Sequence, residues 1–127
     1  MKEIVEQLRK KSELISGESV SGEDVDDAEN RLGLKFAEEY REYIKEFGFV
    51  CYEGHELTGV CKAERLNVVN VTEKEREYVK IVPTDAYVIE QTHIDGIVIW
   101  QTADGAVYQS QGNSFKKINN SLAEYVG

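Results

Sequence analysis

The sequence is short of cysteine, of cationic residues and of long apolar runs, and each shortage excludes a class of protein. Two cysteines in 127 residues are too few for the disulfide framework of a small secreted domain. No segment approaches the ~20 apolar residues that a membrane-spanning helix needs. Lysine and arginine number 15 against 24 aspartates and glutamates, so the formal net charge is −9. This balance disfavours direct binding to nucleic acid, because that affinity comes from cationic side chains that release counterions.

The length and composition of the chain indicate one globular domain over residues 1–127. The chain is 41% hydrophobic and 31% charged, which is typical of a soluble protein without fibrous or disordered bias. Its length is sufficient for one self-supporting core. Residues 1–15 are charged throughout and lack the apolar centre of a signal peptide, so we expect a cytoplasmic protein without a membrane contact. The acidity favours a basic protein partner, although it can also serve solubility alone.

Helical periodicity dominates the first 48 residues. Residues 2–15 are predicted to form an amphipathic helix, and the polar, glycine-punctuated segment 16–22 a loop. A second helix is expected between Ser21 and Gly33, because Ser21 can accept a hydrogen bond from the amide of Asp24 and glycine is favoured just past a helix end. Four residues of this helix share a face: Val25, Ala28, Glu29 and Leu32.

A third helix is predicted over about residues 37–47, with Gly48 as its end. Its apolar stripe predicts that Tyr40, Ile44 and Phe47 are buried against a sheet. The glutamates fall mostly on the outer side: Glu38, Glu39, Glu42 and Glu46. The stretch carries packing residues and negative charge, and we interpret it as architectural.

After Gly48 the pattern changes to short runs of β-branched and aromatic residues. These runs predict strands at 49–52, 56–60, 67–71, 86–92, 96–102, 106–111 and 115–118. Thr72 and Glu75 have the spacing of a capping box, which predicts a short helix over 72–79. Asp104 and Gly105 mark a tight hairpin turn, and Ser121 and Glu124 predict a final helical turn. The fold class is therefore α+β, with N-terminal helices packed on a mostly antiparallel sheet.

The segment VSGEDVDDAENRLGLKFAEEYREYIKEFG, within residues 19–48, resembles the N-terminal motif of the SUKH superfamily. The motif is an acidic helix that ends Glu-x-x-Leu-Gly, followed by an apolar pair, an acidic residue and a tyrosine. The matching residues are Glu29, Leu32, Gly33, Leu34, Phe36, Glu39 and Tyr40. The likeness continues over residues 57–60, 104–108 and 121–125, and it covers about 19–127. Ala37 departs from the family, which usually has proline there, but alanine is a good helix former.

This resemblance implies a SUKH-like α+β domain without known catalytic activity and with a binding role. The superfamily includes fungal cell-wall synthesis regulators and bacterial immunity proteins of polymorphic toxin systems. For a bacterial member it implies neutralisation of a toxin, often a nuclease. The residues themselves identify no toxin.

No metal or cofactor is expected. The soft ligands Cys51, His55, Cys61 and His93 are separated by three, five and thirty-one residues, which matches no standard zinc pairing. Both cysteines lie beside strand-like apolar residues, where free cysteine usually behaves as a small hydrophobe. Paired carboxylates such as those of Asp26 and Asp27 are too common in an acidic chain to indicate acid–base catalysis. The glycines do not form a phosphate-binding loop.

The run GIVIWQT is apolar on both alternations, because Ile97 and Ile99 point one way and Val98 and Trp100 the other. Either the protein covers both faces of this strand, or one face meets a partner. Tyrosine and tryptophan are enriched among interface anchors, and carboxylates in nearby loops would suit a basic partner. The candidate partner-binding residues are Tyr52, Glu53, Glu56, Asp95, Trp100, Asp104 and Tyr108.

Together these observations lead us to expect a non-catalytic immunity protein that masks a basic toxin domain by shape and charge. The alternative is a regulatory or scaffold module that binds a peptide or small ligand, and a third interpretation is an enzyme of unrecognised type. A pocket with convergent, perturbed carboxylates would favour the enzyme.

Overall fold

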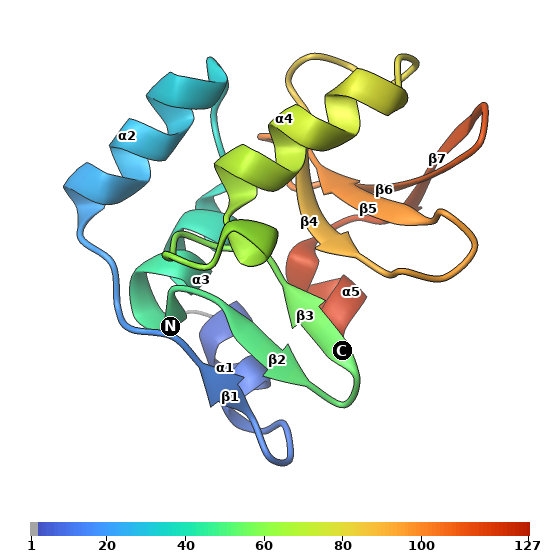
Figure 1. Cartoon of the computed structure of the whole chain (residues 1–127). Helices are drawn as coiled ribbons and strands as arrows, with labels where there is room; N and C mark the ends of the chain where they lie inside the picture. Colours follow the sequence, from blue (N-terminus) through green and yellow to red (C-terminus); the bar gives the residue numbers. More distant parts are fainter. Residues whose placement is uncertain (1–2) are drawn as a thin grey trace.

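The structure is a computed structural model that describes residues 3–127. Most helices come first in the chain and four consecutive strands precede the last helix, as Figure 1 shows. The helices are α1 (Glu3–Arg9), α2 (Gly22–Leu32), α3 (Glu38–Phe47), the 3-10 turn η1 (Glu64–Leu66), α4 (Val68–Tyr78) and α5 (Leu122–Val126). The strands are β1 (Ile15–Ser16), β2 (Val50–Tyr52), β3 (His55–Leu57), β4 (Tyr87–Gln91), β5 (Val98–Gln101), β6 (Val107–Gln111) and β7 (Ser114–Asn119).

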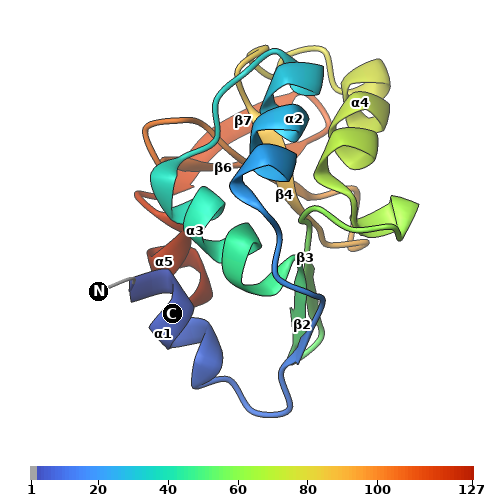
Figure 2. The same cartoon turned by 90° about the vertical axis from the view of Figure 1, so that its left-hand side faces the viewer.

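The seven strands form one sheet in chain order, and every neighbouring pair is antiparallel. Strands β3 and β4 share a single register pair, Leu57 opposite Glu90, so the sheet consists of a β1–β3 part and a β4–β7 part. Helices α1, α3 and α5 lie on one side of the sheet and α4 lies on the other (Figures 1 and 2). The predicted α+β class with a mostly antiparallel sheet is confirmed.

The sheet separates two apolar cores. The larger core joins α1, α2, α3, α5 and the first turn of α4 to the sheet and includes Tyr40, Ile44 and Phe47. These three side chains are at most 5% exposed, as the stripe in α3 predicts. The smaller core lies between α4 and the β4–β5 strands and contains Val88, Val98 and Trp100. The doubly apolar strand β5 is therefore covered on both faces by the protein itself.

Helix α2 begins and ends as its caps predict. The Ser21 hydroxyl accepts a hydrogen bond from the amide of Asp24 at 3.1 Å, and Gly33 adopts φ 68° just past the last turn. Glu29, on the buried face, accepts hydrogen bonds from the amide of Phe36 at 2.8 Å and from Arg41 at 2.7 Å. This carboxylate fixes the loop between α2 and α3, which gives the Glu-x-x-Leu-Gly motif a structural reason.

Glu39 departs from the outer side that was predicted for the α3 glutamates. Its carboxylate turns toward the C-terminal helix and accepts hydrogen bonds from the backbone amides of Leu122 and Ala123. It also accepts one from the buried amide side chain of Gln101 at 2.9 Å. An anionic side chain from α3 thus caps α5, where the positive end of the helix favours negative charge.

The two tyrosines of α3 hold the segment after β3. The Tyr43 hydroxyl donates to the carbonyl of Thr58 at 2.7 Å, and the Tyr40 hydroxyl lies 2.9 Å from the Thr58 hydroxyl. At Gly59 a Cβ atom would lie 1.6 Å from the carbonyl oxygen of Gly48. Two chain segments cross here so closely that only backbone fits between them. Both tyrosine hydroxyls of α3 contact the segment beside this crossing, so we interpret the α3 stretch as architectural.

The predicted helix over 2–15 is wrong beyond Arg9, and its first residue, Lys2, lies outside the described residues. Helix α1 ends in a tight turn in which the amide of Lys11 donates to the carbonyl of Leu8, and Glu13 takes φ 54°. Ile15 then pairs with Cys51 as strand β1. The pairing with β2 overrides the helical spacing of Ile15.

The predicted strand over 67–71 and the capping box at Thr72 are also wrong, because one helix, α4, covers Val68–Tyr78. The side chain of Asn67 caps it by accepting hydrogen bonds from the amides of Val69 and Asn70. Thr72 is buried inside the helix, where its hydroxyl accepts a hydrogen bond from the amide of Val88 at 3.0 Å. Packing against β4 and α2 outweighs the strand preference of the valines.

Candidate functional site

The seven predicted partner-binding residues fall in four separate places. Tyr52, Glu53 and Glu56 come together on the β2–β3 hairpin, around a cavity of about 280 Å³. Asp104 and Tyr108 line a second cavity, of about 520 Å³. Asp95 lies exposed in the β4–β5 loop, where its carbonyl accepts a hydrogen bond from Gln111. Trp100 is inside the protein.

The burial of Trp100 is inconsistent with its prediction as an interface anchor. The side chain is 0% exposed and packs with Val88 and Val98 under α4. Its indole Nε1–H donates to the Ser110 hydroxyl at 2.9 Å, so its polar group is also satisfied internally. Tyr52 is 5% exposed and belongs to the larger core, so it offers a partner little surface. The Lys11 ammonium lies over its ring, 5.2 Å from the centroid.

Asp104 serves the β5–β6 turn. Its carboxylate accepts hydrogen bonds from the Thr102 hydroxyl at 2.6 Å and from the amide of Ala106 at 3.0 Å. These bonds hold the pKa of Asp104 below its usual range. Tyr108 stacks on Phe115 with ring centroids 4.9 Å apart. Both side chains line the second cavity, but their contacts explain them as parts of the hairpin.

The β2–β3 hairpin presents two different faces. Its two-residue loop, Glu53-Gly54, has positive φ at both positions, 48° and 85°, as type I′ hairpin turns require. Because strand side chains alternate, Tyr52 and His55 face the helices, whereas Cys51 and Glu56 face the other way. The tight turn therefore fixes which side chains are presented on each side.

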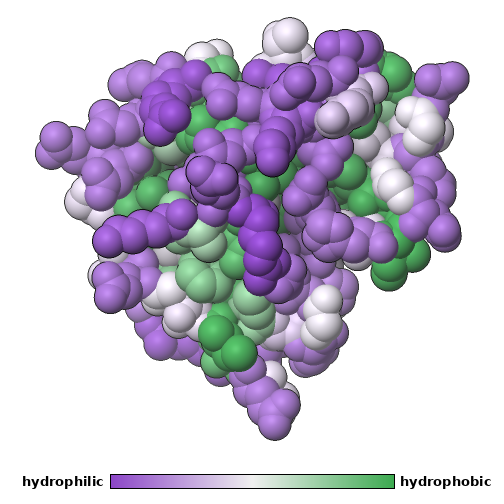
Figure 3. All heavy atoms as spheres, in the orientation of Figure 1, coloured by the Kyte–Doolittle hydropathy of each residue, from purple (hydrophilic) through white to green (hydrophobic). Residues whose placement is uncertain are grey.

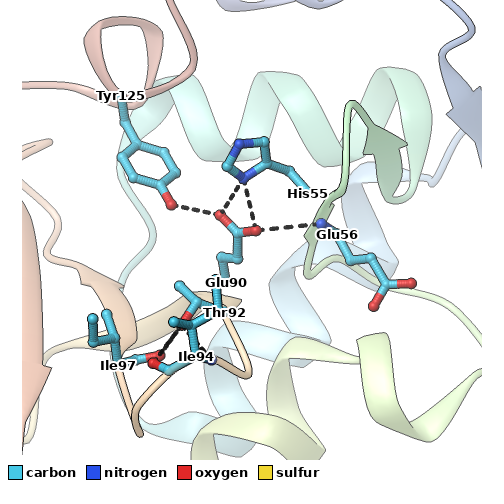
Figure 4. A network of polar contacts seen from close by, with 7 residues as sticks. All are labelled: His55, Glu56, Glu90, Thr92, Ile94, Ile97 and Tyr125. Atoms are coloured by element: carbon cyan, nitrogen blue, oxygen red, sulfur yellow. Dashed lines mark hydrogen bonds and ion pairs between the residues drawn. The ribbon is translucent and has the colours of Figure 1, made fainter.

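A buried carboxylate network anchors the helix-facing side of the hairpin (Figure 4). Glu90 is 3% exposed and accepts hydrogen bonds from Tyr125 at 2.5 Å, from His55 Nδ1 at 3.0 Å and from the amide of Glu56 at 3.3 Å. Burial and the neighbouring Glu90 carboxylate raise the pKa of Tyr125, so its hydroxyl stays protonated and donates. A buried carboxylate needs such partners, and these tie β3, β4 and α5 together.

A β-bulge determines that Glu90 lies in this network. The register places Val88 opposite Trp100 but Glu90 opposite Ile99, so one residue of β4 is skipped. A one-residue shift moves side chains to the other face of a sheet. Without the bulge, Glu90 would point into the apolar core under α4. With it, Glu90 points toward Tyr125.

The other side of the hairpin carries a short row of side chains across three strands. Ile15 pairs with Cys51, and Cys51 pairs with Glu56, so the three side chains lie side by side on one face. Ile15 is 63% exposed. Glu56 is held by two hydrogen bonds from Arg65, at 2.6 and 3.0 Å, which lower its pKa. We call this surface the hairpin face and define it by Glu13, Ile15, Cys51, Glu53 and Glu56, which all line the 280 Å³ cavity.

The cysteines show no sign of activation. Cys51 and Cys61 are both half-buried and free, and burial raises the pKa of each thiol. A raised pKa keeps a thiol protonated and weakly nucleophilic at neutral pH. Within residues 3–127 no three histidine, cysteine, aspartate or glutamate side chains are grouped as metal ligands. Over the same residues, the helices are all too short or too polar to span a bilayer.

Sequence reasoning missed Glu90, His55 and Tyr125 as a connected group. The available signal was Glu90 itself, a charged residue inside the otherwise apolar run AYVIEQT. It also missed Ile15, because helical spacing assigned that residue to the first helix.

Comparison with known proteins gives one family and one fold. The SUKH_5 family model, described as SMI1-KNR4 cell-wall, matches residues 1–127. The fold is similar to that in a crystal structure of a protein from Pseudomonas syringae pv. tomato, with a TM-score of 0.76 and 18% sequence identity. That similarity covers 98% of this chain and 94% of the other. No curated protein matches the chain.

Proposed function

The chain belongs to the SUKH family, and from this membership and its acidic surface we propose that it is a non-catalytic protein that neutralises a bacterial toxin domain. The proposed partner is basic, with a nuclease as the favoured class, and the proposed location is the cytoplasm. Inhibition would be steric, with carboxylates pairing to the lysines and arginines that a nuclease uses to hold nucleic acid. No step of this mechanism requires chemistry on the part of the chain.

The observation that carries this proposal is the combination of family and charge. The net charge is −9, and the turn carboxylates Glu53 and Asp95 are exposed. Within residues 3–127 neither forms a salt bridge. Carboxylates in this state attract a cationic partner over the full Debye length of ~8 Å at physiological ionic strength.

The experiment is the salt dependence of association with a catalytically inactive, basic nuclease toxin domain. We expect the association rate to fall by roughly tenfold between low and moderate salt, with a smaller change in the dissociation rate. Charge reversal at Glu53 and Asp95 should lower the association rate at low salt. Two further variants, Glu56→Gln and Asp104→Asn, complete the set of acidic substitutions. An association rate that changes neither with salt nor with any of the four substitutions would refute the electrostatic mechanism.

The family description, SMI1-KNR4 cell-wall, favours a second candidate function. In that case the chain is a regulatory or scaffold module that binds a peptide or small ligand, without a toxin. Deletion of the gene distinguishes the two. Loss of a toxin inhibitor sensitises cells only when the toxin is present, whereas loss of a regulator changes growth or the cell envelope without it.

A further inference from the structure

We propose that the hairpin face is the docking surface for the partner, and that it takes a segment with one apolar side chain flanked by lysines or arginines. This inference rests on the proposed function only in assuming that the chain binds a protein. It names the place and the chemistry of recognition.

The first argument is the exposure of this part of the sheet. Helix α4 lies over β4 and the strands beyond it, away from β2 (Figure 2), and η1 reaches the β1–β3 part through Arg65, which lies against Glu56. Cys51 and Glu56 point out of this side of the sheet, and Ile15, which is 63% exposed, extends the row to the sheet edge. An antiparallel sheet commonly leaves one face to solvent, but that face then carries polar residues.

The second argument is the apolar content of this surface. Figure 3 shows a mainly hydrophilic face with a hydrophobic area at its lower part, over β1 and β2. Ile15 is 63% exposed and Cys51 half-exposed beside it. Ile15 is an exposed aliphatic residue whose backbone is already fixed in a paired strand. Binding a partner therefore loses little conformational entropy at this residue, which favours it as an anchor.

The third argument is charge, which selects the occupant. Glu13 and Glu53 are exposed and line the same cavity as Ile15 and Cys51, and neither forms a salt bridge within the described part of the chain. Arg65 is already paired to Glu56 by two hydrogen bonds. The surface therefore offers two uncompensated carboxylates beside an exposed aliphatic side chain, which complements a cationic segment. A second copy of this chain would bring like charges together, which opposes self-association.

The test uses random peptides displayed on phage and selected against the whole protein. We expect enriched sequences in which lysine or arginine flanks leucine, isoleucine or phenylalanine. The enriched peptide, labelled for fluorescence anisotropy, should bind Ile15→Ser and Glu53→Lys at least about tenfold more weakly than the unsubstituted protein.

Two matched controls exist in the β4–β5 loop. Ile94 is 62% exposed, almost the same as Ile15, and Asp95 is an exposed acidic turn residue with positive φ, like Glu53. Ile94→Ser should leave peptide affinity within about twofold, because it removes an equally exposed isoleucine that lies off the hairpin face. Asp95→Lys should do the same at physiological salt, where the long-range attraction that Asp95 adds at low salt is screened. Circular dichroism confirms that each variant is folded.

Three outcomes would overturn the inference. One is selection of peptides without basic residues, or of none. Another is equal peptide affinity for Ile15→Ser and Ile94→Ser. The third is a concentration-dependent dimer in sedimentation that Ile15→Ser abolishes, which would make a second copy the occupant.

A cell assay separates this inference from the proposed function. The assay measures whether co-expression of the chain restores growth to cells that express a basic nuclease toxin domain. If the unsubstituted chain gives no rescue while peptide binding still depends on Ile15, the toxin function fails and the docking surface stands. If rescue survives the combined Ile15→Ser and Glu53→Lys substitutions, the docking surface is wrong and the function stands.

Discussion

Replacing Tyr125 with phenylalanine removes a single hydroxyl from α5 and tests whether the Glu90 network holds the domain together. That hydroxyl donates to Glu90 Oε1 at 2.5 Å, and the ring packs against the larger core. Phenylalanine keeps the ring and its packing. The change in the free energy of unfolding therefore reports on the hydrogen bond and on what its loss does to the carboxylate.

The expected loss follows from the partners of Glu90. A hydrogen bond to a charged group contributes about 1.5–3 kcal/mol. Tyr125 is half-buried, so water replaces part of the bond and the lower end, about 1.5 kcal/mol, is appropriate. A chain of 127 residues loses about 4 °C in melting temperature per kcal/mol, so a decrease of about 6 °C is expected.

The assay is urea unfolding at neutral pH, followed by the fluorescence of buried Trp100. Tyr78→Phe is the matched control, because Tyr78 is 82% exposed. The same substitution there removes a hydroxyl that contacts solvent. The double variant with Glu90→Gln should lose less stability than the sum of the two single variants, since contacting residues are coupled. Equal unfolding midpoints for Tyr125→Phe and Tyr78→Phe would refute the network as a source of stability.

Three further predictions concern positions that the structure explains. Thr72→Val should lower the free energy of unfolding by about 1–3 kcal/mol, because a buried amide of β4 loses its acceptor; an unchanged urea midpoint would contradict this. Gly59→Ala should prevent stable folding, since its Cβ would lie 1.6 Å from a carbonyl oxygen, whereas Gly22→Ala, with its nearest atom at 4.0 Å, should fold normally by circular dichroism. Asp104 has a folded pKa below its unfolded value, so it stabilises the fold above the unfolded pKa and this contribution is lost as pH falls through the folded pKa. Asp104→Asn should therefore flatten the fall of the urea midpoint on acidification, and an unaltered pH profile would count against the bonds from Thr102.

The sequence by itself determined the elements whose signals are local. The Ser21 cap and Gly33 delimit α2, and Gly48 ends α3, because each signal acts through backbone hydrogen bonds within one helical turn. The resemblance to the SUKH superfamily likewise depends only on the order and spacing of motifs along the chain. Helix periodicity in α3 correctly placed Tyr40 in the core, since residues four apart share a face whatever the rest of the chain does.

Other features depended on which segments meet in space. The valines after Asn67 have strand preference, yet they form α4, because the larger and smaller cores bury them on a helix. Ile15 has helical spacing, yet it pairs with β2. Alternation alone left both faces of β5 open to either interpretation, and only the coverage by α4 decided that Trp100 is core.

The candidate site shows the same division. Its turn carboxylate, Glu53, was predicted because the residues between two strand-like runs are polar or glycine, which marks a loop in the sequence. Its buried anchor, Glu90, was not, because a one-residue bulge in β4 decides whether that side chain meets Tyr125 or the core under α4. A bulge depends on the register between two strands, and register is set by packing across the whole sheet rather than by neighbouring residues.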